Sequence, residues 1–253
     1  MRNGRLIFIG DIHGCRAEFE ALIDKVKPAS EDEVVCLGDF FDKGPDAAGA
    51  VKFARQIGVR AIRGNHEDWY LRYRKHEKKR ATDPKYVNPM KAMPFEGEDL
   101  LTRMSEDDWA WIEAQPLYRR WPGIVAVHGG LRPGYTPETH DPGELMRLRW
   151  VDEAGKHVPV DYDVTGGTHK KVTHWTTRYN GQDHVVYGHE AHTLSVPHVY
   201  KTPQGALCFG VDTGCVHGGH LTALIVEPDL TYRFEQVRAE RAYRVPHEPI
   251  PWA

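Results

Sequence analysis

The chain has 253 residues and a nearly balanced charge, with 33 lysines and arginines against 36 aspartates and glutamates. This balance argues against an extended nucleic-acid-binding surface, because affinity for a phosphate backbone depends on clustered basic side chains. It leaves a small phosphorylated substrate open. No apolar run approaches the roughly 20 residues of a membrane span, and the apolar N-terminal stretch is too short for a signal peptide. The four cysteines lack the paired spacing of a zinc ribbon or redox motif. We therefore expect a reduced protein of the cytoplasm with no membrane contact.

The first 65 residues alternate between strand and helix patterns. Short apolar runs predict strands at 6–9, 34–37 and 59–62. Between them, apolar side chains at helical spacing predict helices at 17–26 and 47–57. This β-α-β-α-β order favours a sheet of parallel strands with right-handed crossovers.

Residues 67–110 break this rhythm. A helix is predicted from Tyr70 to Arg80, followed by a segment with prolines and methionines, and we interpret the whole as a helical cap inserted into a single domain. The basic run from Arg72 to Arg80 is most simply a solvated helix face. Its alternative role is to steer anionic substrates into a cleft.

The second half of the chain has the pattern of short strands joined by loops. Strand character resumes at 121–127, whereas 132–181 has weak periodicity and is predicted to be mostly loop. Further β-like runs lie at 185–187, 195–200, 206–209, 221–226 and 231–237. Their turns at 203–205 and 228–229 suit hairpins. The predicted domain spans 1–237, and residues 238–253 form a tail.

Polar motifs close five of the predicted strands, at the edge of an α/β sheet where ligands bind. They are GDIHG from Gly10, GDFFDKGP from Gly38, RGNHE from Arg63, VHGG from Val127 and YGHEAH from Tyr187. A single Gly-Asp is more often a turn, and a single histidine is more often structural. Five such motifs in order favour one shared site, and aspartate, asparagine and histidine together suit Mn, Fe or Zn.

As a joint pattern, these motifs closely resemble the phosphoprotein-phosphatase branch of the calcineurin-like metallophosphoesterases, in particular its small bacterial, phage and diadenosine-tetraphosphatase-like members. The resemblance runs from Gly10 to about Val226. It implies an α/β fold, a four-layer αββα sandwich with two mixed sheets and a helical cap insertion. It also implies two divalent metal ions per chain, with Mn²⁺ as the preferred metal and Fe or Zn as alternatives.

The resemblance implies a role for each polar residue of the motifs. Asp11 and His13 would hold the first ion, and Asp39 would bridge both, since only a carboxylate offers two anionic oxygens. The second ion would be completed by Asn65, His128 and His189. His66 would be the general acid, with its ring oriented by Asp42.

The motifs indicate two different classes of substrate. Lys43 stands where phosphoprotein phosphatases normally carry arginine and resembles the diadenosine-tetraphosphatase-like group, whereas Asp42 is a phosphoprotein-phosphatase feature. Arg63 is a second candidate phosphate clamp. Arg147 and Arg149 could supply another, with Arg149 the residue assigned to the site, although solvated surface charge is the simpler explanation for both. We expect hydrolysis of phosphate monoesters, as in phosphoprotein phosphatases. The alternative is a pyrophosphohydrolase of diadenosine tetraphosphate, related nucleotides or polyphosphate. An inactive phosphate-binding module is disfavoured by the intact ligand set.

Four residues near these motifs have a weaker case. His192 lies three residues after His189, and a ligand role is the lesser alternative to a fortuitous neighbour. His217 and His220 are equally well explained as surface residues. Cys15 adjoins the first motif and is most simply a buried thiol.

Overall fold

Two five-stranded mixed sheets form the centre of the computed structural model, which describes residues 3–90, 95–159 and 172–244. The first sheet contains β1 (Leu6–Ile9), β2 (Glu33–Cys36), β3 (Arg60–Ala61), β12 (His220–Val226) and β13 (Tyr232–Arg238). The second contains β4 (Tyr118–Trp121), β5 (Ile124–Val127), β9 (His184–Tyr187), β10 (His198–Lys201) and β11 (Leu207–Gly210). Their orders are β13-β12-β1-β2-β3 and β10-β11-β9-β5-β4. Strands β1, β2 and β3 are parallel, as predicted, and so are β5, β9 and β11.

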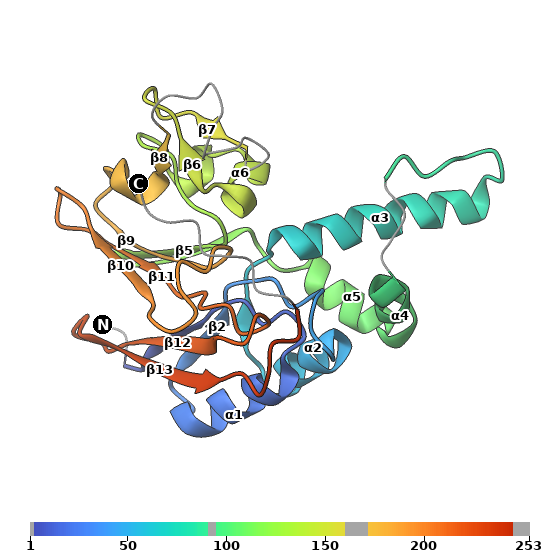
Figure 1. Cartoon of the computed structure of the whole chain (residues 1–253), viewed down its shortest axis with the longest axis horizontal. Coiled ribbons are helices and arrows are strands. Elements are labelled where there is room, and N and C mark those ends of the chain that lie inside the picture. Colours follow the sequence, from blue (N-terminus) through green and yellow to red (C-terminus); the bar gives the residue numbers. More distant parts are fainter. Residues whose placement is uncertain (1–2, 91–94, 160–171, 245–253) are drawn as a thin grey trace.

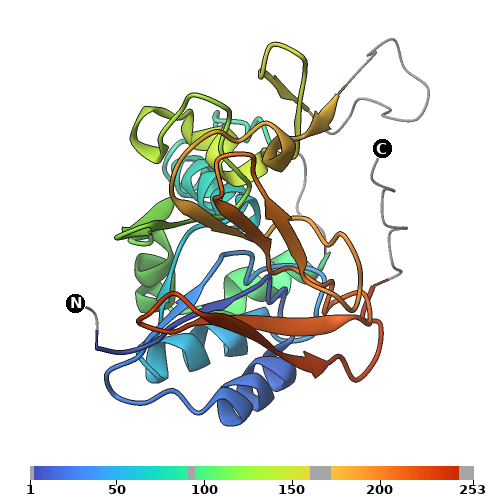
Figure 2. The same cartoon turned by 90° about the vertical axis from the view of Figure 1, so that its left-hand side faces the viewer.

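Alternating side chains divide each central strand between two faces. In β1, Leu6 and Phe8 point between the two sheets, where they share a core with Val186 of β9. Ile7 and Ile9 belong to a second core on the opposite face of the first sheet. The two sheets therefore pack face to face (Figures 1 and 2). Buried apolar side chains fill the space between them.

Helices and a small third sheet cover the two outer faces. On the first sheet lie α1 (Arg16–Val26) and α2 (Ala47–Gln56). On the second lie α6 (Pro142–Arg147), the 3-10 turn η2 (Trp175–Thr177) and a three-stranded sheet. The strands of this small sheet are β6 (Trp150–Val151), β7 (His157–Val158) and β8 (Thr173–His174). The chain thus has the αββα sandwich that its motifs predict (Figure 1).

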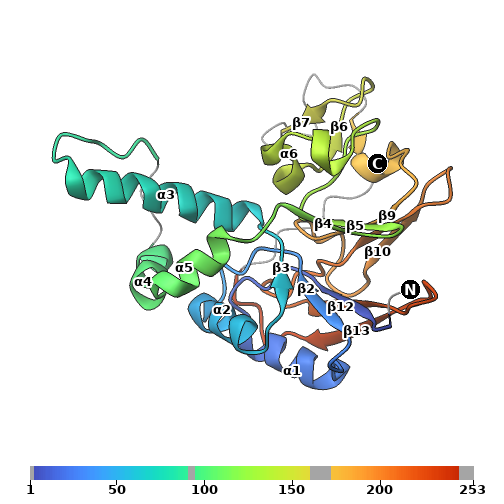
Figure 3. The same ribbon diagram turned by 180° about the vertical axis from the view of Figure 1, so that it is seen from behind.

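The inserted segment is helical, as predicted. It forms α3 (Asn65–Thr82), α4 (Phe95–Arg103) and α5 (Glu106–Glu113), and the last two pack on α2. Helix α3 extends away from the sheets (Figures 1 and 3). It is longer than the predicted helix and begins inside the third motif, so it leads directly out of the site. Among the described residues, none of the helices has both the length and the apolar character needed to cross a bilayer.

Two details of the sequence prediction were wrong. The strand predicted at 121–127 is a β4–β5 hairpin that turns at Gly123, where φ is 76°. The run at 195–200 is displaced to β10. The 132–181 segment, of which 160–171 lie outside the described residues, is mostly loop, as predicted, but it also holds α6, η2, the 3-10 turn η1 (Pro137–Thr139) and the short strands of the small sheet. Strands of two residues have no periodicity for a sequence to reveal.

The turns after β10 and β12 are hairpins, as predicted. The described part of the predicted tail, residues 239–244, lies against the first sheet and α1. There the backbone N–H of Tyr243 donates to the Val216 carbonyl, and its hydroxyl donates to Oε1 of Glu18 at 2.8 Å.

Candidate active site

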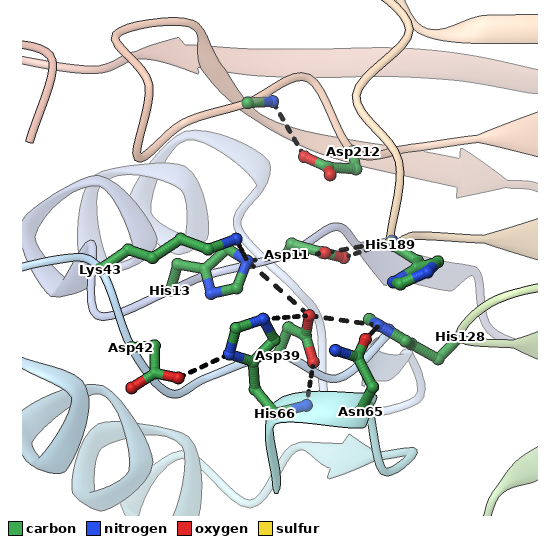
Figure 4. A network of polar contacts seen from close by, with 12 residues as sticks. Asp11, His13, Asp39, Asp42, Lys43, Asn65, His66, His128, His189 and Asp212 are labelled. Carbon is green, nitrogen blue, oxygen red and sulfur yellow. Dashed lines mark hydrogen bonds and ion pairs between the residues drawn. The ribbon is translucent and has the colours of Figure 1, made fainter. Parts of the chain in front are cut away.

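The parallel strands of both sheets deliver their polar motifs to one place (Figure 4). Asp11 and His13 follow β1, and Asn65 and His66 open α3 just after β3. The loop after β2 carries Asp39, Asp42 and Lys43, and the second sheet contributes His128 after β5 and His189 after β9. This convergence follows from topology, because the carboxyl ends of parallel strands meet at one edge of a sheet.

Asp39 lies at the centre of this group. Its Oδ2 is 3.2 Å from Nε2 of His128, 3.7 Å from Nε2 of His13 and 3.8 Å from Nε2 of His66. Two three-residue groups whose ligand atoms lie within 4.8 Å of one another share this carboxylate. They are His13–Asp39–His66 and Asp39–His128–His189. The arrangement can hold two cations with Asp39 between them.

Backbone carbonyls orient two of the imidazole rings. Nδ1 of His13 lies 2.7 Å from the Phe41 carbonyl, and Nδ1 of His128 lies 2.7 Å from the Leu37 carbonyl. Because a carbonyl oxygen can only accept, each Nδ1 carries the hydrogen and each Nε2 faces Asp39, as in metal-binding histidines. Nε2 of His189 is buried and has no hydrogen-bond partner among the described residues. This orphaned nitrogen fits a metal ligand.

The electrostatics of the group suit a cation. Burial alone would lower the pKa of His128, but the Asp39 and Asp11 carboxylates raise it to about 10. Burial would raise the pKa of Asp39, yet His128 and His66 hold it well below its usual range. Asp39 is therefore anionic in a buried site, and the potential around it favours positive charge.

His66 is held by a carboxylate on the side away from Asp39. Its Nδ1 lies 2.7 Å from Oδ2 of Asp42, and the Tyr70 hydroxyl donates to the other oxygen of that carboxylate. Figure 4 shows the ring between Asp42 and Asp39. Sequence reasoning placed Asp11 with His13 at the first ion, and Oδ2 of Asp11 lies 3.9 Å from Nε2 of His13. The three-residue group that contains His13 and Asp39 also includes His66.

The backbone of the site is strained. Among the described residues, seven that are not glycine have positive φ, and five of them belong to these motifs: His13, Asp39, Asp42, Lys43 and His189. Such conformations cost on the order of 1–3 kcal/mol each and cluster at functional sites. At Gly64 the absence of a side chain allows the backbone to lie against Asp39, because a Cβ there would be 2.2 Å from Oδ1 of Asp39.

Sequence reasoning missed two carboxylates of the site. Glu67 is buried and accepts backbone N–H groups of Asp39, Phe40 and Gly64 at 2.8–2.9 Å, so it holds the loop after β2. The sequence signal for Glu67 is its capping-box position. It lies three residues after Gly64, the N-cap residue of α3, and a glutamate there accepts a hydrogen bond from the N-cap backbone N–H. Asp212 follows the sixth parallel strand, β11, as the other site residues follow theirs.

The predicted phosphate clamps lie in different places. Nζ of Lys43 lies inside the group, 2.9 Å from Nε2 of His13. Arg149 lies behind His189 and donates to its carbonyl oxygen at 3.0 Å. Arg63 lines a separate groove of about 380 Å³ along α3. The groove that contains His66, of about 310 Å³, is instead lined by Asp42, Asn65, Trp69, Arg72 and Arg147.

The residues with a weaker case also lie in different places. Cys15 is buried with Cys215 nearby, and Nδ1 of His220 lies 2.8 Å from the Leu194 carbonyl. His192 belongs to another group of side chains, described below.

A family model for calcineurin-like phosphoesterases matches residues 4–192, so the chain belongs to this family of phosphoester hydrolases, which use divalent metal ions.

Relatives of two activities are similar to nearly the whole chain. It is 29% identical over 238 residues to the asymmetrical bis(5'-nucleosyl)-tetraphosphatase PrpE of Bacillus subtilis (strain 168), covering 85% of this chain and 87% of that protein. It is 26% identical over 227 residues to serine/threonine-protein phosphatase 1 of Salmonella typhimurium, covering 87% and 92%. A solved structure described as a candidate diadenosine tetraphosphatase has a TM-score of 0.70 at 26% identity, covering 94% of each chain.

Proposed function

We propose that this chain is a cytoplasmic enzyme that hydrolyses phosphate monoesters in the manner of a phosphoprotein phosphatase. It would use two divalent cations, with Mn²⁺ as the preferred metal and Fe or Zn as the alternatives. The observation that carries the proposal is the His66–Asp42 pair, joined at 2.7 Å beside Asp39. A serine or threonine oxygen is a poor leaving group, so its release needs a proton from a positioned acid. The pair supports His66 as that acid, with Asp42 holding its ring.

The remaining residues divide between binding the cations and binding the phosphate. Asp11 and His13 would hold the first cation and Asp39 would bridge the two. The second would be held by Asn65, His128 and His189. Bound divalent cations supply Lewis-acid chemistry, since they offset phosphoryl charge and make a water more acidic. Lys43 would bind a phosphoryl oxygen through its ammonium group.

Replacement of the acid tests the proposal. His66→Asn should keep both metal ions and lower turnover of a phosphoserine peptide by roughly 10²–10⁴-fold, the range for a lost general acid. The loss should be much smaller for 4-nitrophenyl phosphate, because nitrophenolate hardly needs a proton. Steady-state kinetics on both substrates is the measurement.

A histidine on the same helix provides the control. His76, which contacts the Tyr86 hydroxyl, lies outside the His66 groove, and His76→Asn should leave both rates unchanged. Equal losses on the two substrates in His66→Asn would rule out the acid role.

A second candidate function is hydrolysis of dinucleoside polyphosphates or polyphosphate. The observation that favours it is Trp69, which lines the His66 groove with Arg72 and Arg147. An aromatic ring beside arginines can stack a nucleobase, which is worth about 1–3 kcal/mol, while the arginines bind outer phosphates. The similarity to a bis(5'-nucleosyl)-tetraphosphatase agrees with this reading.

A side-by-side assay decides between the two. The Mn-loaded protein is given a phosphoserine peptide, diadenosine tetraphosphate and polyphosphate. The first proposal expects the highest kcat/KM on the peptide, and a higher value on either polyphosphate substrate would favour the second. If nucleotides are the substrates, Trp69→Ala should reduce kcat/KM for diadenosine tetraphosphate selectively, whereas Tyr135→Ala, at an exposed aromatic residue outside the groove, should not.

A further inference from the structure

A second group of ligand-type side chains lies apart from the proposed active site. His174 ends β8 of the small sheet, and Glu190 and His192 lie in the loop after β9. One ligand atom from each of these three residues lies within 4.8 Å of the other two. Both histidines are buried and the Glu190 side chain is 12% exposed. None of the three belongs to the groups around Asp39.

The spacing of these side chains suits a shared cation. Nε2 of His174 is 3.2 Å from Oε2 of Glu190, yet this buried oxygen accepts no hydrogen bond from a described residue. Two ligand atoms on a tetrahedral zinc ion, each 2.0–2.1 Å from the metal, are about 3.3 Å apart. The separation is also that between His128 and Asp39 in the active site, 3.2 Å.

Hydroxyl groups hold the far sides of the rings. Nδ1 of His174 lies 2.8 Å from Oγ1 of Thr176, and Nε2 of His192 lies 3.0 Å from the hydroxyl of Tyr187. That hydroxyl also contacts Nδ1 of His198 at 2.8 Å. Metal-binding histidines typically use one ring nitrogen for the ion and the other for such an outer contact, which fixes the ring.

We propose that His174, Glu190 and His192 form a third divalent-metal site, for Zn²⁺, with a structural role. Two imidazoles and one carboxylate are a borderline donor set that suits zinc. The site would tie β8, on the outer layer, to the loop that follows β9 of the second sheet. An ion there cross-links two segments about 16 residues apart in sequence, the separation of His174 and Glu190. The site goes beyond the proposed hydrolysis and does not depend on it.

Zinc counting on variants tests the site. Each protein is stripped with a chelator, reloaded with Zn²⁺, freed of excess metal and measured by inductively coupled plasma mass spectrometry. His174→Asn should bind one ion fewer than the wild type. His157→Asn, the matched control on β7 of the same small sheet, should bind the wild-type number, because His157 is outside the group. Equal zinc content in His174→Asn and the wild type would overturn the proposal.

A second arm separates this site from the active site. In Asp39→Asn, zinc should still raise the midpoint of thermal unfolding, and adding His174→Asn should abolish that rise. If zinc no longer raises the unfolding midpoint in Asp39→Asn, the structural site is overturned. If Asp39→Asn retains its active-site metal, only the bridging role of Asp39 is contradicted. If His174→Asn does not fold, Glu190→Gln replaces it, and anomalous scattering at the zinc edge from wild-type crystals decides. Density among the three side chains supports the site, and density only around Asp39 overturns it.

Discussion

Asp39 is the residue on which the proposed metal chemistry depends most, because its carboxylate is shared by both candidate ligand groups. Asp39→Asn puts a neutral amide where two cations need an anionic bridge. We expect this variant to lose activity and to bind less metal than the wild type, as measured by metal analysis of the purified protein. Asp229→Asn, in an exposed turn, is the matched control. Two ions per chain at wild-type affinity in Asp39→Asn would contradict the bridging role.

Lys43 tests how the phosphate is bound. If its ammonium group holds a phosphoryl oxygen, Lys43→Ala removes a charge-assisted contact of about 1.5–3 kcal/mol, so KM should rise and kcat/KM should fall roughly ten- to hundredfold. Lys201→Ala, at an exposed position on β10, should change neither. Wild-type kinetics in Lys43→Ala would remove this residue from the site.

The arginine variant at the same position separates the two substrate classes. Lys43→Arg recovers a bidentate clamp for a single phosphoryl group, so monoester hydrolysis should persist. In a site shaped for a polyphosphate chain, the larger planar group should obstruct binding, and diadenosine tetraphosphate hydrolysis should fall more strongly. The reverse order of effects would favour the nucleotide-hydrolase function.

At the scale of elements, the start of α5 depends on one buried carboxylate. Oδ2 of Asp108 accepts from the backbone N–H and hydroxyl of Ser105 at 3.0 and 2.7 Å, and Oδ1 pairs with Arg55 of α2. Burial alone would raise the pKa of Asp108, but the Ser105 hydrogen bonds and Arg55 hold it below its usual range. This residue therefore links the helical insertion to the first outer layer.

The stability of that link should depend on pH. Because the folded-state pKa is lowered, the contribution of Asp108 is complete above the ordinary carboxyl pKa of about 3.9 and is lost as the pH falls through the lower folded-state value. At pH 7, Asp108→Asn should reduce the free energy of unfolding by about 1–3 kcal/mol. Urea unfolding should show this difference shrinking below about pH 4. Asp107→Asn, exposed in the same helical turn, should have little effect, and a pH-independent loss in Asp108→Asn would refute the charge argument.

For the whole molecule, the core between the two sheets holds the two halves of the site in register. Phe8 is fully buried there and packs edge-on against Trp121, with ring centroids 5.3 Å apart. Phe8→Ala should lower the free energy of unfolding by about 3–5 kcal/mol, because it removes a large buried side chain and leaves a cavity. Val196→Ala, at a side chain 62% exposed, should change it by less than about 0.5 kcal/mol. Equal losses in the two variants would show that this core does not govern stability.

Sequence patterns were sufficient to predict the parts of the fold that have a local signal. Short apolar runs followed by Gly-Asp or Gly-Asn predicted β1, β2 and β3, because strand, turn and polar side chain lie within one short segment. Parallel strands bring such segments to one edge whatever the loops between them do. This is why Asp11, Asp39 and His128 could be assigned to one site before any contact was known.

Which side chains face one another could be learned only from the packing of the folded chain. Arg149 and Arg63 carry the expected charge but lie behind His189 and in a neighbouring groove, and no periodicity records where a long side chain ends. Glu67 holds the Asp39 loop across 28 positions of the chain. The His174–Glu190–His192 group unites a two-residue strand with the loop after β9. Such contacts arise from packing between distant segments, and local sequence patterns carry information only about neighbours along the chain.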